Sequence, residues 1–160
     1  PTSGDQRFST CHSQELRLQS ADDARIGILL TTVKLQRIML ADDEPDILEI
    51  SKIALEAIGG YEVAVCTSGR ALLEQLADFE PDLIVVDVLM PDLTGPQVLE
   101  EIRRIPEYED IPVVYLTGVM QKEGEDDLLG TGVVDVILKP FDPMTLADRL
   151  EGIWKEFHGI

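Results

Sequence analysis

The sequence has few aromatic residues, few cysteines and no long apolar run. Aromatic side chains make up 5% of its 160 residues, so valine, isoleucine and leucine must fill the core. The two cysteines, Cys11 and Cys66, lie far apart and outside any spacing typical of metal ligands. We therefore expect a reduced, cytoplasmic protein. Because no apolar run is long enough to span a membrane, we expect no membrane insertion.

Basic residues are also scarce in most of the chain. Residues 1–36 carry four acidic and four basic side chains, so the net charge of −18 belongs to residues 37–160, which hold 27 acids and 9 bases. Such a surface repels the phosphates of nucleic acids, and we expect no direct nucleic-acid binding. The charge has two interpretations, which are an ordinary solvated surface and a local cluster of carboxylates around a cation.

The beginning of the chain differs from the rest. Residues 1–35 are rich in small and polar side chains and show only a weak helical stretch over residues 14–24. We expect residues 1–35 to be an N-terminal extension and residues 36–160 to be the folded domain. A flexible tail, a linker and part of an upstream segment are alternatives that the sequence leaves open for the extension.

Short apolar stretches alternate with longer helical patterns from residue 36 onward. Residues 83–86 are apolar at every position, as expected for a strand buried on both faces of a sheet. The alternation predicts a doubly wound α/β fold, a five-stranded parallel sheet with helices on both faces. Strands are expected near 38–41, 61–66, 83–86, 113–116 and 133–138, and helices near 45–58, 68–76, 95–102, 122–129 and 143–157.

Polar side chains stand at the carboxyl ends of these strands. Asp42 and Asp43 follow the first strand and Asp87 follows the third. Thr117 and Lys139 follow the fourth and fifth. Because the carboxyl ends of parallel strands share one edge of the sheet, we expect these residues to lie together. Crowded carboxylates repel one another without a cation, and oxygen ligands favour Mg²⁺. A carboxylate there is a competent nucleophile toward phosphorus.

Four segments lie at these strand ends, namely LADDEP (40–45), DVLMPDLTG (87–95), LTG (116–118) and KPF (139–141). Together they resemble the receiver domain of two-component response regulators, over about residues 36–158. The resemblance implies a flavodoxin-like strand order 2-1-3-4-5 and a phosphorelay function. The domain would not be a conventional enzyme, although it would catalyse its own phosphorylation and dephosphorylation. Its partner would be a sensor histidine kinase or a histidine phosphotransfer protein.

The resemblance also implies which residues hold the cation and the phosphoryl group. Asp87 would accept the phosphoryl group from a phosphohistidine and form an aspartyl phosphate. Asp43 would bind Mg²⁺ directly, Asp42 mainly through a bound water, and the backbone carbonyl of Leu89 would be a further ligand.

Two further residues would act on the transferred group. Lys139 would pair with the phosphoryl group, and Thr117 would be the switch hydroxyl that moves to meet it. The Lys139-Pro140 peptide bond is expected to be cis. Gly95 is expected to permit the turn into the following helix.

The sequence departs from the family pattern at three apolar positions. Many receivers carry an aromatic residue three positions before the lysine, where this chain has Val136. Such an aromatic commonly swings inward as the threonine moves, so the coupling of phosphorylation to a partner must differ here. Leu89 and Val119 resemble the positions that tune water access. Because apolar side chains cannot orient an attacking water, we hypothesise slow self-dephosphorylation.

Two other functions compete with a signalling receiver. An Mg²⁺-dependent phosphohydrolase with an aspartate nucleophile usually has a second acid two residues later, where this sequence has Leu89. A nucleotide- or flavin-binding domain would need a glycine-rich loop after the first strand, which is missing. The chain ends soon after the last helix. We therefore expect a stand-alone regulator acting through protein contacts, or a receiver that belongs to a larger protein.

Overall fold

The computed structural model describes residues 34–118 and 128–160. Its centre is a five-stranded parallel sheet in the order β2-β1-β3-β4-β5. The predicted fold class and strand order are therefore confirmed. The strands are β1 (Arg37–Ala41), β2 (Glu62–Cys66), β3 (Leu83–Val86), β4 (Val113–Thr117) and β5 (Asp135–Leu138).

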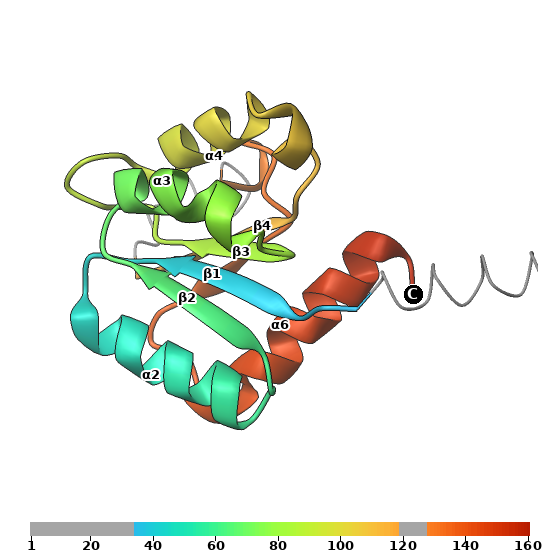
Figure 1. Cartoon of the computed structure of the whole chain (residues 1–160). Helices are drawn as coiled ribbons and strands as arrows, with labels where there is room; N and C mark the ends of the chain where they lie inside the picture. The colour runs from blue at the N-terminus through green and yellow to red at the C-terminus, as the bar shows by residue number, and fades with distance from the viewer. Residues whose placement is uncertain (1–33, 119–127) are drawn as a thin grey trace, which may run out of the picture. The chain divides into compact units, whose positions relative to one another are not determined.

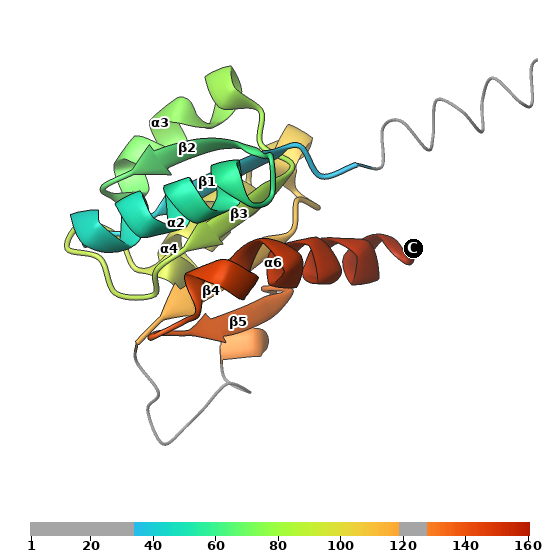
Figure 2. The same ribbon diagram turned by 90° about the horizontal axis from the view of Figure 1, so that it is seen from below.

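Helices cover both faces of this sheet. Figures 1 and 2 show α2 and α6 together on one face, and α3 and α4 together on the other. No helix among the described residues is both long and apolar enough to cross a membrane. The helices are α2 (Pro45–Ala57), α3 (Gly69–Phe79), α4 (Gly95–Arg103) and α6 (Pro143–His158), with a short 3₁₀ helix at Pro106–Tyr108.

Two predicted segments lie largely outside the described residues. The expected extension over residues 1–35 is described only from residue 34, so it stays a prediction. The helix expected over 122–129 is described only at its last two positions, which are helical.

Helices α3 and α4 begin where the sequence supplies side-chain caps. Ser68 Oγ accepts a hydrogen bond from the backbone N–H of Ala71 at the start of α3. Thr94 and Gln97 form a reciprocal capping box at the start of α4. Gly60 has φ +69° just after α2, which is the left-handed conformation that glycine adopts without strain. The starts of α3 and α4 and the end of α2 are thus determined by local sequence.

The last strand begins later than the sequence predicts. A strand was expected from Val133, but β5 begins at Asp135. Gly132 has φ +102°, and Val134 N–H bonds the carbonyl of Val113 before regular pairing starts. The turn at Gly132 therefore takes up two residues that their apolar character assigned to the strand.

Helix α2 buries a different face from the one suggested by its isoleucines. Ile50 and Ile53 of α2 and its C-cap residue Ile58 recur at helical spacing but are 43%, 58% and 45% exposed. The buried positions of the helix are Leu48, Ser51, Ala54 and Leu55. Together with Pro143 and Met144 of α6, the exposed isoleucines line a wholly apolar groove of about 220 Å³. We call this surface the α2–α6 groove, and its lining is Ile50, Ile53, Ala54, Ala57, Ile58, Pro143 and Met144.

Gly95 brings α4 close to the end of β3. A Cβ atom at this position would lie 2.9 Å from the carbonyl oxygen of Asp87 and 3.0 Å from the Cα of Val88. It would also lie 3.1 Å from the ring of Tyr115. Gly95 does not have a positive φ, so it permits the turn into α4 by leaving room for this backbone rather than through a special conformation. Glycine is required here because backbone approaches it.

We predict opposite effects for alanine at two glycines. Gly95→Ala should lower the free energy of unfolding by about 2 kcal/mol, since the new methyl group meets backbone that cannot move aside. Gly152→Ala should raise it by about 0.5–1 kcal/mol, because alanine favours a helix interior and this Cβ meets nothing within 4 Å. Urea unfolding of both variants measures the difference. Equal stabilities would show that the close approach at Gly95 is unimportant.

Candidate functional site

Backbone pairing carries each predicted site residue to one edge of the sheet. Asp42 N–H donates to the Cys66 carbonyl at 3.1 Å and Asp87 N–H to the Ala41 carbonyl at 2.9 Å. Lys139 N–H donates to the carbonyl of Thr117 at 2.8 Å. The parallel ladder thus continues one residue past β1, β3 and β5. The polar side chains at these positions are fixed by the strands rather than by free loops.

Lys139 joins the two buried carboxylates. Its Nζ lies 2.5 Å from Asp42 Oδ2 and 3.3 Å from Asp87 Oδ2. The Asp42 and Asp87 residues are 1% and 5% exposed, and the lysine side chain is 11% exposed. The ammonium therefore neutralises charge that water reaches poorly, which makes this contact stronger than a surface ion pair. As predicted from strand ends, Asp42, Asp87 and Lys139 lie together.

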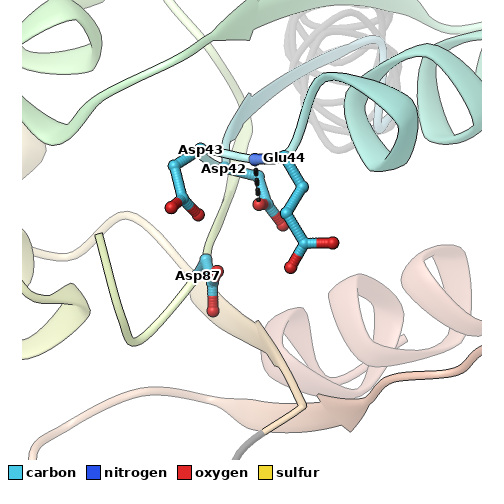
Figure 3. Close-up of side chains that lie close together, drawn as sticks. All are labelled: Asp42, Asp43, Glu44 and Asp87. Atoms are coloured by element: carbon cyan, nitrogen blue, oxygen red, sulfur yellow. Dashed lines mark hydrogen bonds between the residues drawn. The ribbon is translucent and has the colours of Figure 1, made fainter. Parts of the chain in front are cut away.

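Four carboxylates gather beside this lysine. One oxygen from each of Asp42, Asp43, Glu44 and Asp87 lies within 4.8 Å of the others. Figure 3 shows the four side chains turned toward one region where β1 and β3 end. Asp43 and Glu44 are exposed, so a ligand entering from solvent meets them first. We call these four residues the acidic cluster.

Glu44 is the member of the acidic cluster that the sequence analysis missed. It occupies the N-cap position of α2, but its side chain makes no capping hydrogen bond. Its Oε1 lies instead 3.6 Å from Lys139 Nζ, and its backbone N–H donates to Asp42 Oδ1 at 2.9 Å. The signal was present, because Glu44 continues the acidic run of Asp42 and Asp43.

The charges of the site shift two pKa values in the same direction. Burial raises the pKa of the Asp42 carboxyl, and the charge of Asp87 raises it too, against the hydrogen bonds from Lys139 and Glu44. Burial alone would lower the pKa of the Lys139 ammonium, but its hydrogen bond to Asp42 and the surrounding carboxylates raise it above its ordinary value. The main causes of the two shifts therefore differ: burial raises the pKa of Asp42, and the neighbouring carboxylates raise that of Lys139.

The acidic cluster suits a hard divalent cation. Its potential ligands are carboxylate oxygens, and the set includes no histidine or cysteine. Leu89 lies beside it, since its backbone N–H approaches Asp87 Oδ1 at 3.4 Å. The Leu89 side chain is 53% exposed and points no polar group at the site. These donors fit Mg²⁺ better than a transition metal.

Thr117 and the residues behind it complete the edge. Thr117 ends β4, between the strands that carry Asp87 and Lys139, and is fully buried. Two residues earlier, the buried Tyr115 has its hydroxyl 2.9 Å from Thr131 Oγ1. Val136, at the usual aromatic position, is the register partner of Tyr115 on β5. The Lys139-Pro140 peptide bond is cis, as predicted. Val119, the second position proposed to control water access, lies outside the described residues.

Comparisons of sequence match most of the described domain to known proteins. Residues 38–151 match the family described as the response regulator receiver domain. A probable cyclic di-GMP phosphodiesterase of Vibrio cholerae is 34% identical over 113 residues, which are 71% of this chain and 25% of that protein. The response regulator SaeR of Staphylococcus aureus is 32% identical over 124 residues, 76% of this chain and 53% of SaeR. The chain thus spans about half or less of these relatives' length.

Comparisons with solved structures indicate the same family as the comparisons of sequence. The chemotaxis response regulator CheY4 of Vibrio cholerae aligns with a TM-score of 0.68 at 28% identity, covering 75% of this chain and 99% of CheY4. The receiver domain of a histidine kinase from Syntrophus aciditrophicus aligns with a TM-score of 0.67 at 30% identity, covering 76% and 91% of the two chains. Family match and fold together show that the chain belongs to the response regulator receiver domain family of two-component signalling.

Proposed function

We propose that this domain accepts a phosphoryl group on Asp87 from the phosphohistidine of a sensor histidine kinase or a histidine phosphotransfer protein. The observation that carries the proposal is the position of the Asp87 carboxylate. It is nearly buried, it lies in the acidic cluster, and it is 3.3 Å from the Lys139 ammonium. A nucleophile with a fixed cation beside it is what transfer to a carboxylate requires.

Asp42, Asp43, Asp87 and the backbone carbonyl of Leu89 are the residues proposed to hold Mg²⁺. When bound, the ion would supply charge that offsets the negative oxygens of the phosphoryl group and of the acidic cluster. The acidic cluster supports this assignment, because one oxygen from each of its four carboxylates lies within 4.8 Å of the others.

The proposed transfer uses the chain's own residues as follows. A carboxylate oxygen of Asp87 attacks the phosphorus, the phosphorus–nitrogen bond of the donor breaks, and the imidazole leaves with its electron pair and takes up a proton. The Lys139 ammonium and the Thr117 hydroxyl would each hold one oxygen of the transferred group. Nothing in this step needs a general acid at residue 89, which is consistent with a switch rather than a phosphohydrolase.

The α2–α6 groove supports a protein as the phosphoryl donor. Both helices that form it begin just after site residues, α2 after Asp43 and Glu44 and α6 three residues after Pro140. Only the α6 part of the groove, Pro143 and Met144, lies at the start of its helix, so a donor would approach the acidic edge from that end of the groove. Its contact surface should be an apolar helix face flanked by basic side chains, because acidic residues prevail over the domain.

The free, buried thiol of Cys66 supports a reducing compartment such as the cytoplasm.

The central proposal predicts a covalent adduct at one residue. Acetyl phosphate with Mg²⁺ should add one phosphoryl group to the wild type, detected as a mass increase of the intact protein. Asp87→Asn should abolish the adduct, because the amide is a far weaker nucleophile. Chelation of Mg²⁺ should lower the rate at least tenfold. An equal adduct on Asp87→Asn, or none on the wild type, would refute the assignment of Asp87.

The groove predicts a difference between protein donors and small donors. Ile53→Asp should slow transfer from phosphorylated histidine phosphotransfer domains at least tenfold, because it places a charge in an apolar contact. Its rate with acetyl phosphate should stay within twofold of wild type. Leu129→Asp is the control, since Leu129 is also exposed, at 38%, but lies outside the groove. Equal losses with both kinds of donor would argue against the groove as the docking surface.

A further inference from the structure

Asp92 links the loop after Asp87 to a neighbouring helix. Its Oδ1 accepts a hydrogen bond from Gly69 N–H at 3.2 Å, and its Oδ2 accepts one from Arg70 N–H at 2.9 Å. Gly69 and Arg70 are the first two residues of α3. Their N–H groups have no partner within the helix, and the positive end of its dipole favours a carboxylate. One side chain thus binds two elements that the sequence separates by 22 residues or more.

The same loop has few other anchors between its two ends. Gly95 N–H donates to the carbonyl of Val88 at 2.8 Å, which closes the loop at its base. Leu93 packs against α3 so closely that a Cβ on Gly69 would lie 3.0 Å from its Cβ. Within the described part of the chain, the hydrogen bonds that tie residues 89–93 to another helix or strand are those of Asp92.

The carboxylate of Asp92 is held as an anion. Its small degree of burial would raise its pKa, but hydrogen bonds from backbone N–H groups, those of Arg70 and Gly69 among them, lower the pKa below the ordinary value. Asp92 is therefore charged at neutral pH. The charged form accepts both hydrogen bonds, whereas an amide would keep one oxygen acceptor.

Leu89 lies between Asp92 and Asp87 on this loop. The hydrogen bond from Leu89 N–H to Asp87 Oδ1 is long, at 3.4 Å, so it orients the loop only weakly. The conformation of the backbone at Leu89 then depends on how firmly the segment that follows it is attached. Asp92 and Leu93 attach that segment to α3.

We propose that Asp92 is a positioning residue for the cation. By binding the start of α3 it holds the β3–α4 loop in one conformation, and so keeps the backbone carbonyl of Leu89 available to the acidic cluster. The inference rests on the proposed function, in which that carbonyl is a ligand of Mg²⁺. Asp92 itself contacts neither the cation nor the phosphoryl group. Its effect is to reduce the ordering that the loop must undergo when the ion binds.

The test compares two residues that cap the same helix end. Asp92→Ala removes the two bonds that reach α3 from the loop. Ser68→Ala removes the bond to Ala71 N–H at 3.1 Å, which comes from the helix's own N-cap and leaves the loop attached. Both variants should lower the melting temperature by a few degrees. Only Asp92→Ala should weaken Mg²⁺ binding, by about fivefold or more in isothermal titration calorimetry, with Asp92→Asn in between.

Phosphorylation supplies a second measurement. The Mg²⁺ concentration that gives half the maximal rate with acetyl phosphate should rise in Asp92→Ala by the same factor as the dissociation constant. The maximal rate at saturating Mg²⁺ should stay within twofold of wild type, since no reacting group is altered. The adduct should remain on Asp87.

Distinct outcomes separate this inference from the proposed function. If the wild type binds Mg²⁺ and is phosphorylated on Asp87, but Asp92→Ala binds the ion as tightly, the role of Asp92 is overturned. Equal weakening by Ser68→Ala also overturns it, because the effect would then belong to the stability of α3. If the wild type itself binds no Mg²⁺, the proposed function fails and this inference fails with it.

Discussion

The contact of one ammonium with two buried carboxylates constrains the whole functional edge. β5 lies two strands from β3 and three from β1, so at about 4.8 Å per strand the side chains of Lys139 and its two aspartate partners must together span roughly 10–14 Å across the sheet. The long stem of Lys139 crosses the end of β4, where Thr117 lies. A shorter basic side chain at this position would leave Asp42 and Asp87 without a counter-charge. The length of lysine and the strand order are therefore matched to each other.

The edge still carries more negative than positive charge. The acidic cluster sets four carboxylates against the Lys139 ammonium. Folding tolerates this because Asp43 and Glu44 are exposed to water, while the two buried members share the lysine. Favourable strand pairing and core packing offset the repulsion that remains between the carboxylates. The excess of negative charge at this edge therefore favours the binding of a further cation.

The sequence predicted the residues that end strands and missed those whose role depends on packing between helices. Asp42, Asp87, Thr117 and Lys139 could be found because apolar runs mark where each strand stops. The buried face of α2 could not be found, because both of its stripes are apolar and the buried one includes Ser51. Asp92 gave no signal either, since its partners on α3 are backbone N–H groups that any residue supplies.

Tyr115 on β4 supplies a buried aromatic ring beside Val136, the position on β5 where many receivers have an aromatic residue. The ring lies one strand away, on β4, fully buried and with its hydroxyl engaged by Thr131. Turning such a ring would break that hydrogen bond and open a void in the core, so the ring is held in place beside Gly95 at the start of α4. The hydrogen bond from Tyr115 to Thr131 therefore joins β4 to the turn that precedes β5 through side chains as well as through strand pairing.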